Sequence, residues 1–469
     1  MGEFTSCIGD KVYKIDPKYY LSIRKKLPIL HKVYDKIYAC IKTIYLPDAI
    51  AIISSMLTDI LPRTGKHITN GLVASVCNIL TLKLLQKRDM HIAAKVRNPK
   101  KILVISDLNI GDSVNLQSVV LMAKKFFSQS KVDYAVNAKA YNLVACNRYI
   151  DGVFNILSYD ICASERAVSY LIDSENYDFI INLCPFFKKS SIVGDKKLPF
   201  IDYRTLSARL IYNELYSNRL NHVSYQAYSY FSDLFREVKR ISDFAAEKNV
   251  FTTSIWLSDE AIHKAMQFLC KNELSHNKGL VLFNPDATSI YTQLPFDTQL
   301  DILKDLCESD LVQTVLLTSG HTYLGIENRL LEALPNHNKV IVIPKEMPID
   351  VYAALIDFCD VFISSDTGTM HIAAAKKFNE SGYELRNKTA VFSVFGATSA
   401  RMYGYDSCDG NFLKPGQNRS SKLYISSAPC RNITCINKKA KRCRNVRCFE
   451  GINGSEIAKD IIVYLSKDN

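Results

Sequence analysis

The sequence predicts an α/β protein with two Rossmann-like, doubly wound domains, preceded by a helical N-terminal extension. Three observations support this fold class. Short apolar runs alternate with amphipathic segments from residue 101 onward, which is typical of parallel strands joined by helices. The alternation starts again near residue 280, after a long helical stretch. The chain has 469 residues, more than one hydrophobic core normally serves.

The predicted parts are an N-terminal extension, a first Rossmann-like domain, a second Rossmann-like domain and a C-terminal helix, at residues 1–99, 100–250, 278–454 and 455–469. Within the extension, apolar residues recur at a spacing of three to four over Tyr19–Ile44 and Leu72–Leu85, which predicts helices. We expect the extension to be a helical cap or an oligomerisation surface; a module that recruits a substrate is the alternative.

The first domain opens with a buried strand and continues in strand–helix alternation. Strands are expected at Ile102–Ile105, Val132–Val136, Val153–Leu157 and Asp178–Leu183. After the first strand, one helix face carries the apolar residues Leu116, Val119, Val120, Ala123, Phe126 and Phe127. The stretch 206–248 is helical and rich in tyrosine and arginine. Its aromatic residues are expected in a helix core, although they could also line a groove. Residues 250–278 are expected to cross between the domains.

The second domain repeats the pattern. Strands are expected at Leu280–Phe283, Thr314–Thr318, Val340–Ile343, Asp360–Ser364 and Ala390–Phe395. A final helix begins at Ser455, with an apolar stripe at Ile457, Ile461, Ile462 and Leu465. In open α/β sheets, ligands bind beyond the carboxyl ends of the strands, so we expect the functional residues there in both domains.

The charge balance favours anionic partners. Lysine and arginine number 59 against 47 aspartates and glutamates, a formal charge of +12. The basic residues are scattered except at Asn437–Arg442, and no nucleic-acid-binding signature accompanies them, so nucleic acid is not the expected partner. The N-terminus shows no secretory signal. The apolar stretch Leu46–Leu61 contains two aspartates and is shorter than the about 20 residues that span a membrane. We therefore expect a cytoplasmic protein.

The segment Phe362–Ala375 carries the most specific motif. An apolar strand leads into Asp366-Thr367-Gly368, and a helix of small residues follows, with Met370 and His371 in its first turn. Unpaired backbone N–H groups at a helix start attract anions such as phosphate. Aspartate and threonine also cap helices, so a tight connection without a ligand is the alternative.

This string resembles the donor-site motif of glycosyltransferase family nine, the bacterial heptosyltransferases, in which Asp-Thr-Gly-x-x-His precedes an alanine-rich helix. Three further blocks are similar to family segments in the same order. Leu282–Ser289, with Thr288, resembles the segment that opens the donor half. Ser319 and Glu327 lie in a block similar to the element near the nucleoside. Gly396 lies in a block similar to the late loop near the diphosphate.

The resemblance covers about residues 101–466 and implies a GT-B architecture, with an acceptor domain and a nucleotide-sugar donor domain facing across a cleft. It implies an inverting transfer of heptose, most simply from ADP-heptose, to a lipopolysaccharide core or a protein hydroxyl, with no catalytic metal. The enzyme would work in the cytoplasm, with peripheral contact with the inner membrane and an oligomer as further options. A catalytically inactive nucleotide-sugar-binding scaffold or regulator is the second hypothesis, and a nucleotide-sugar epimerase the third.

The turn Gly111-Asp112 follows the first strand of the first domain. In the family resembled, a glycine–aspartate turn here supplies the base that takes the proton of the acceptor hydroxyl. Asp112 is therefore the expected catalytic residue, with Gly111 leaving room for the acceptor; a helix-capping aspartate is the alternative. The resemblance implies that the nucleotide-sugar site includes residues Gly111, Thr288, Ser319, Glu327, Asp366, Thr367, Gly368, Met370, His371 and Gly396.

The chain also departs from the family pattern. Many members carry a lysine or arginine where this sequence has Thr292, so no cation for the diphosphate is supplied there. Asn284 and Asp286 replace the usual histidine and glycine. Arg401 or Lys345 could provide the missing charge. About ten additional polar residues, Phe378–Lys388, follow the donor helix.

Cysteines fall into two groups. Ten of the 14 are dispersed through apolar stretches and are expected to be reduced thiols. The other four follow the spacing C-x4-C-x7-C-x4-C, at Cys430, Cys435, Cys443 and Cys448. Paired thiolates can hold a structural zinc or iron, and the segment resembles the metal finger of family members that modify autotransporter proteins. Four reduced cysteines without metal are the alternative.

Overall fold

The computed structural model describes residues 5–8, 11–14, 82–96, 98–194, 196–216, 222–239, 253–274, 279–320, 325–334, 338–405, 421–428 and 447–467. The chain divides into two compact units. One comprises residues 1–88 and 207–218, and the other comprises residues 89–206 and 219–469. Both sheets discussed below belong to the second unit.

The N-terminal unit contains a β-hairpin where only helices were expected. Strands β1 (Thr5–Ile8) and β2 (Lys11–Lys14) pair antiparallel, with Ile8 opposite Lys11. The two intervening residues in the sequence are glycine and aspartate, a combination typical of tight hairpins, and this signal was missed. A helix covers residues 82–93, which includes the end of the second predicted helix. The predicted helix at 19–44 lies outside the described residues.

The first half of the second unit is a parallel sheet in the order β5-β4-β3-β6-β7. Its strands are β3 (Lys101–Ile105), β4 (Lys131–Asn137), β5 (Gly152–Leu157), β6 (Phe179–Asn182) and β7 (Phe200–Asp202). The four predicted strands are confirmed, whereas β7, only three residues long, was not predicted. The chain leaves β3 toward β4 on one side and later returns to β6 on the other, so β3 is the point where the winding reverses.

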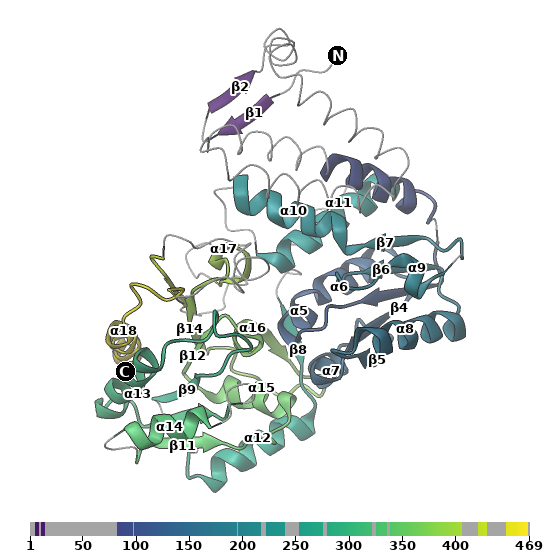
Figure 1. Cartoon of the computed structure of the whole chain (residues 1–469). Coiled ribbons are helices and arrows are strands. Elements are labelled where there is room, and N and C mark those ends of the chain that lie inside the picture. Colours follow the sequence, from purple (N-terminus) through teal and green to yellow (C-terminus); the bar gives the residue numbers. More distant parts are fainter. Residues whose placement is uncertain are drawn as a thin grey trace. The chain divides into compact units, whose positions relative to one another are not determined.

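Helices cover both faces of this first sheet (Figure 1). Helices α6 (Gln117–Phe126) and α11 (Val223–Lys239) pack together, with the rings of Phe126 and Phe235 5.6 Å apart. Phe235 also contacts Phe179 of β6, so these aromatic residues belong to the core, as predicted. The other helices of this half are α7 (Ala138–Val144), α8 (Ile161–Glu175) and α9 (Lys189–Ile192). Helix α10 (Tyr203–Tyr216) begins here, and its residues from 207 onward belong to the N-terminal unit.

The second half is a parallel sheet in the order β11-β10-β9-β12-β14-β15. Its strands are β9 (Leu280–Asn284), β10 (Thr314–Thr318), β11 (Val340–Ile343), β12 (Val361–Ser365), β14 (Ala390–Phe395) and β15 (Ser421–Ile425). The five predicted strands are confirmed and β15 is additional. Here the winding reverses between β9 and β12, which places the Asp366 motif at the switch point.

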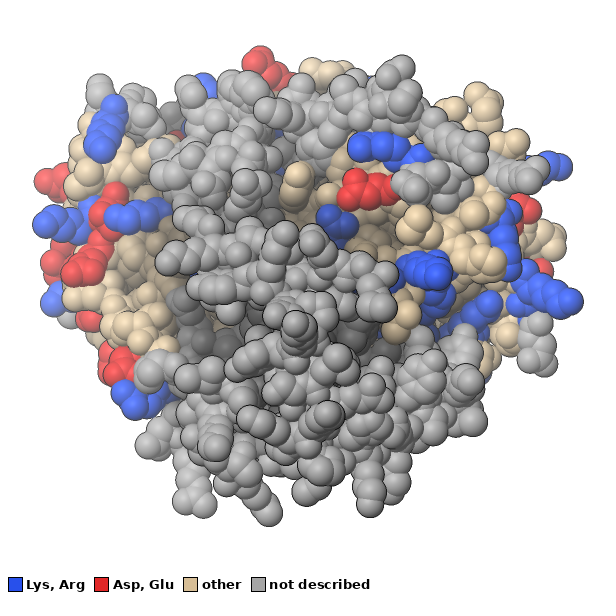
Figure 2. Space-filling view, turned by 90° about the horizontal axis from the view of Figure 1, so that it is seen from above, with Lys and Arg blue, Asp and Glu red and all other residues tan. Residues whose placement is uncertain are grey.

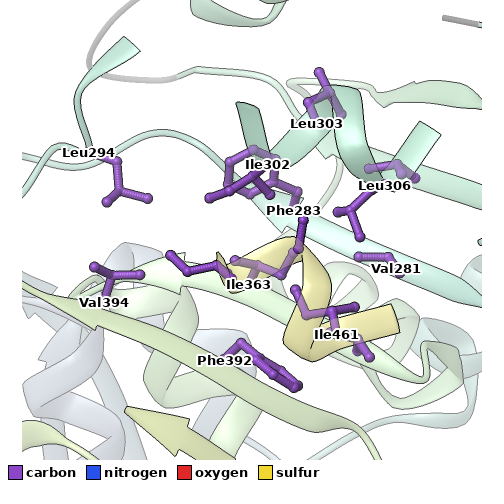
Figure 3. Close-up of a cluster of buried hydrophobic side chains, with 14 of the residues drawn as sticks. Val281, Phe283, Leu294, Ile302, Leu303, Leu306, Ile363, Phe392, Val394 and Ile461 are labelled. Atoms are coloured by element: carbon purple, nitrogen blue, oxygen red, sulfur yellow. The ribbon is translucent and has the colours of Figure 1, made fainter. Parts of the chain in front are cut away.

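The core of this half lies between the sheet and helices α13 (Phe296–Glu308), α14 (Ile326–Ala333) and α18 (Gly454–Lys467). Figure 3 shows Ile461 of α18 facing the sheet residues Phe283, Ile363 and Phe392. The apolar stripe predicted for the last helix is thus confirmed at its buried positions. Helices α12 (Asp259–Lys271), α15 (Ile349–Phe358) and α16 (Gly368–Ala374) also belong to this part of the chain.

A short parallel strand pair lies where a crossing segment and a polar insertion were expected. Strand β8 (Ser254–Trp256) pairs with β13 (Lys376–Phe378), and the rings of Trp256 and Phe378 stack 4.9 Å apart. The Gln117 side chain of α6 donates to the Ser254 carbonyl at 2.8 Å. The crossing segment is therefore bonded to elements of both halves.

The described surface carries both signs of charge. In Figure 2, basic and acidic side chains are interspersed over one flank of the described residues, and basic ones predominate over the other. This agrees with the scattered distribution of lysine and arginine in the sequence. No helix within the described residues is both long enough and apolar enough to span a bilayer.

Candidate functional site

The two turns that the sequence singled out lie against each other. Helix α5 (Ile110–Asn115) starts after β3, and α16 starts after β12. A Cβ on Gly111 would lie 2.6 Å from Cδ2 of His371 and 3.4 Å from Cα of Gly368. A Cβ on Gly368 would in turn lie 3.3 Å from Cβ of Ile110. Glycine at these two positions therefore permits the close approach of the turns.

Asp112, the expected base, lies in the first turn of α5. Its carboxylate accepts a hydrogen bond from Nδ2 of Asn109 at 3.3 Å. Burial raises the pKa of Asp112 above the usual range, and the Asn109 bond offsets part of this. The single predicted helix is in fact two, because Leu116 separates α5 from α6 and its N–H bonds to the Asp112 carbonyl.

A second carboxyl group, Asp107, lies at the end of β3 and was not considered from the sequence. Its own Oδ1 accepts the Leu108 N–H at 2.5 Å, and its carbonyl accepts the Ser106 hydroxyl at 2.9 Å. Burial raises the pKa of Asp107 to about 7, and the negative charge of Asp112 adds to this effect. The two aspartates therefore titrate as an interacting pair.

On the donor side, Asp366 lies beside His371, with 3.7 Å between Oδ1 and Nε2. Burial and, to a smaller extent, the charge of Asp112 raise the pKa of Asp366 to about 6, and the Thr398 side chain opposes this shift. Burial lowers the pKa of His371 to about 3, so the imidazole is neutral near pH 7. The effect of the Asp112 charge on Asp366 agrees with the close approach of the two turns.

His371 joins the two halves through Asn115 and Tyr405. Its Nδ1 lies 3.3 Å from Nδ2 of Asn115 and 3.0 Å from the Tyr405 hydroxyl, and that hydroxyl donates to Oδ1 of Asn115 at 3.1 Å. The ring of His222 lies 4.5 Å from that of Tyr405. Sequence reasoning missed Asn115 and Tyr405, because single polar residues outside a motif give no signal before the halves are brought together.

Tyr403 of helix α17 (Ala400–Tyr403) was also missed. Burial raises its pKa well above the usual value, and the charges of Asp112, Asp366 and Asp107 contribute to the shift. The hydroxyl group of Tyr403 is thus influenced by the charges of all three aspartates of the site.

The remaining residues of the donor motif hold the turn together. Thr367 is the N-cap of α16, and its hydroxyl accepts the Met370 N–H at 3.4 Å. Asn284, which replaces the family histidine, donates to the hydroxyls of Ser364 and Thr369 at 3.1 and 3.0 Å. The departure at Asn284 therefore links the end of β9 to the Asp366 turn.

Four residues were predicted to contact the donor from less specific motifs, and three of them make contacts within the protein itself. The Ser319 hydroxyl donates to the Ile343 carbonyl at 2.6 Å, and Glu327 accepts the Gly320 N–H at 3.0 Å. A Cβ on Gly396 would lie 2.8 Å from the Phe449 ring, so packing alone explains this glycine. Thr288 is exposed. Ligand contacts of these four residues stay predictions.

The structure shows what Thr292 does at the position where many family members carry a lysine or arginine. The Thr292 hydroxyl donates to the Ser289 carbonyl at 3.1 Å, so this residue closes its own loop. Lys345 and Arg401 are both exposed, and Arg401 lies in the same short helix as Tyr403. Of the two basic residues, Arg401 is the one close in sequence to Tyr403, whose pKa is raised by the charges of the site aspartates.

Of the four cysteines predicted as metal ligands, only Cys448 lies within the described residues. Cys448 is buried in the hydrophobic core of the second half, beside Phe449. Cys430, Cys435 and Cys443 lie outside the described residues, within which no group of three or more His, Cys, Asp or Glu side chains is arranged to hold a metal. The metal site stays a prediction, and the core position of Cys448 favours the alternative for that residue.

The comparisons with known proteins agree with this geometry. A family model described as glycosyltransferase family 9 (heptosyltransferase) matches residues 167–440. A family 9 glycosyltransferase structure from Veillonella parvula is similar with a TM-score of 0.56 and 14% identity, over 78% of this chain and 98% of that one. The ADP-heptose LPS heptosyltransferase II of E. coli gives 0.51 and 14%, over 78% and 99%.

No curated protein matches the sequence. The structural similarity confirms the predicted GT-B fold, and the family match spans more than half of the chain. The chain belongs to glycosyltransferase family 9 and is a glycosyltransferase.

Proposed function

We propose that this enzyme transfers heptose from ADP-heptose to a hydroxyl group of a lipopolysaccharide core or of a protein. Membership of a heptosyltransferase family supports the sugar and the nucleotide-sugar donor. The observation that carries the proposal is the contact between the Gly111 and Gly368 turns, which brings a buried carboxylate from one half beside the donor motif of the other.

In the proposed reaction, ionised Asp112 takes the proton of the acceptor hydroxyl as its oxygen bonds to the anomeric carbon. The bond from that carbon to the β-phosphate oxygen breaks in the same step, and ADP leaves with the electron pair. A single displacement of this kind inverts the anomeric configuration. The raised pKa of Asp112 makes it a stronger base than a solvated carboxylate.

The donor side would bind and orient the leaving group. Backbone N–H groups near Gly368 and the neutral imidazole of His371 can donate hydrogen bonds to the oxygens on which charge develops. Arg401 is the side chain that we assign to the diphosphate charge in place of the family cation. The formal charge of +12 suits a cytoplasmic enzyme working at the inner leaflet of the bacterial inner membrane, and we propose that location.

The acceptor face would lie on the first half. Tyr159 follows β5 at the carboxyl edge of the sheet, is 59% exposed, and has the Lys139 ammonium 5.5 Å from its ring centroid. Partial desolvation and, to a smaller extent, the charge of Asp107 raise the pKa of Tyr159. Tyr159→Ala should raise the KM for acceptor and leave the KM for donor unchanged, whereas Tyr170→Ala, at an exposed tyrosine later in α8, should change neither.

The decisive assay follows ADP release from ADP-heptose, with and without an acceptor preparation of lipopolysaccharide core or unmodified protein. Asp112→Asn should bind donor with wild-type affinity and lose transfer by about 100-fold or more. The control Asp297→Ala removes an exposed first-turn carboxylate from α13 and should transfer normally. Retained transfer in Asp112→Asn would exclude this residue as the base. Donor binding without turnover in the wild type would favour a nucleotide-sugar-binding scaffold.

A further inference from the structure

The cluster of Asn115, His371 and Tyr405 joins the helix that carries the base to the helix that carries the donor motif. Asn115 is the last residue of α5, three positions after Asp112, and is fully buried. His371 is in the first half of α16, and Tyr405 follows α17. The three side chains are mutually within hydrogen-bonding distance, at 3.0 to 3.3 Å.

The polarity of the Asn115 amide determines the state of the histidine. The Tyr405 hydroxyl lies 3.1 Å from Oδ1 of Asn115 and 3.0 Å from Nδ1 of His371, and its single proton is shared between these two acceptors. The other end of the amide, Nδ2, lies 3.3 Å from Nδ1 of His371. An amide NH2 group can only donate, and Nδ1 must therefore present its lone pair. In a neutral imidazole the proton then resides on Nε2, the nitrogen 3.7 Å from Asp366.

We propose that Asn115 and Tyr405 are positioning residues that hold His371 as its Nε2–H tautomer, aimed at Asp366 and the leaving group. This inference rests on the proposed function for its catalytic consequence, but not for its structural content. The opposite tautomer would set the Nε2 lone pair against an ionised carboxylate, which is repulsive, and would remove the only donor that the ring can offer on that side.

The environment of His371 keeps this arrangement in place. His371 is 5% exposed, and its Cδ2 atom lies 2.6 Å from the position that a Cβ on Gly111 would take. The titratable groups that face it are Asp366, His222, Tyr403 and Tyr405, with Asp112 acting through its field on Asp366. Burial lowers the pKa of His371 to about 3, and the neutral ring therefore functions through its N–H rather than through a positive charge.

Two variants separate the effect of the cluster from that of simple loss of packing. Tyr405→Phe removes one hydroxyl and releases the Asn115 amide. Asn115→Asp keeps the size of the side chain but replaces the donor that faces Nδ1 with an acceptor, which favours protonation of Nδ1. Tyr177→Phe is the matched control, because it removes a buried tyrosine hydroxyl, bonded to Asp133 at 2.8 Å, at the opposite edge of the first sheet.

The first measurement needs no substrate. In protein labelled with 15N-histidine, two-bond 1H–15N correlation spectra distinguish the two neutral tautomers and the cation, and His371→Gln assigns the signal. We expect an unprotonated Nδ1 and a protonated Nε2 in the wild type, and a protonated Nδ1 in Asn115→Asp. A wild-type ring protonated on Nδ1 would overturn the proposal.

The second measurement is kinetic. Tyr405→Phe and Asn115→Asp should each lower kcat about 10- to 100-fold while the KM for ADP-heptose changes less than about two-fold, because the group is misdirected rather than removed. Tyr177→Phe should lose stability and keep kcat. Wild-type kcat in Asn115→Asp, with its tautomer changed, would refute the positioning role. If the wild type transfers no heptose while its spectrum shows Nε2–H, the proposed function fails and the structural assignment stands.

Discussion

The close approach of the Gly111 and Gly368 turns yields a quantitative prediction for Gly111→Ala. The new Cβ would lie 2.6 Å from Cδ2 of His371, whereas ordinary van der Waals contacts begin near 3.4 Å, so the atoms must separate by about 0.8 Å. The histidine cannot easily yield, because Asn115 and Tyr405 both lie within hydrogen-bonding distance of its Nδ1 and hold the ring in place. The opposing backbone at Gly368 lies at 3.4 Å and limits movement on that side.

The displacement should therefore move one turn relative to the other. Overpacking of this kind costs about 1–3 kcal/mol of unfolding free energy. A misplacement approaching 1 Å between base and donor costs about 100-fold in rate. We expect Gly111→Ala to lose about 1–3 kcal/mol in urea denaturation and about 30- to 100-fold in kcat, with a smaller change in the donor Kd measured by calorimetry.

Gly152→Ala is the matched control. A Cβ there would meet Oδ1 of Asp133 at 2.7 Å, a similar overlap, but at the start of β5 and away from the site. It should lower stability and leave kcat unchanged. If Gly111→Ala retained both wild-type stability and wild-type kcat, the contact between the turns would be wrong.

Three further predictions follow from burial and charge. Asp112→Asn should lower the pKa of Asp107 from about 7, because the neighbouring negative charge is removed; an unchanged value, read from the 13C titration of the Asp107 carboxyl group, would show that the pair does not interact. The folded-state pKa of Asp366, about 6, exceeds the usual 3.8, so its ionisation costs stability as pH rises from about 4 to 6. Asp366→Asn should therefore raise the unfolding free energy above pH 6 by on the order of 2–3 kcal/mol and have little effect at pH 4. Ile461→Ala should cost about 3 kcal/mol in urea denaturation, because the side chain is fully buried in the core, whereas Val463→Ala, at a position 43% exposed on the same helix, should cost less than about 1 kcal/mol.

Much of the fold could be predicted because its strands are short, continuous apolar runs. Parallel strands buried on both faces have this composition, and all nine strands expected in the two sheets are present. The strand pair β8–β13 escaped prediction because Lys376 and Lys377 do not resemble a buried strand. The hairpin near the N-terminus escaped because the helical periodicity farther along the extension was extended over residues 5–14.

The site could be predicted as far as its motifs reach. Asp112 and the Asp366–His371 turn follow strands at the two switch points, and the structure places them side by side. Asn115 and Tyr405 could not be found in this way, because their partner is 256 and 34 residues distant in the chain. Asp107 could have been found, since it lies two residues after β3 and five residues before the expected base.

The central claim is that the aspartates of the two turns share one site, and the pKa of Asp366 measures this most directly. Titration of its side-chain carboxyl 13C resonance should give a pKa near 6 in the wild type, and a lower value in Asp112→Asn, where the neighbouring charge is absent. An identical pKa in both proteins would contradict the shared site, and with it the proposed transfer between the two halves.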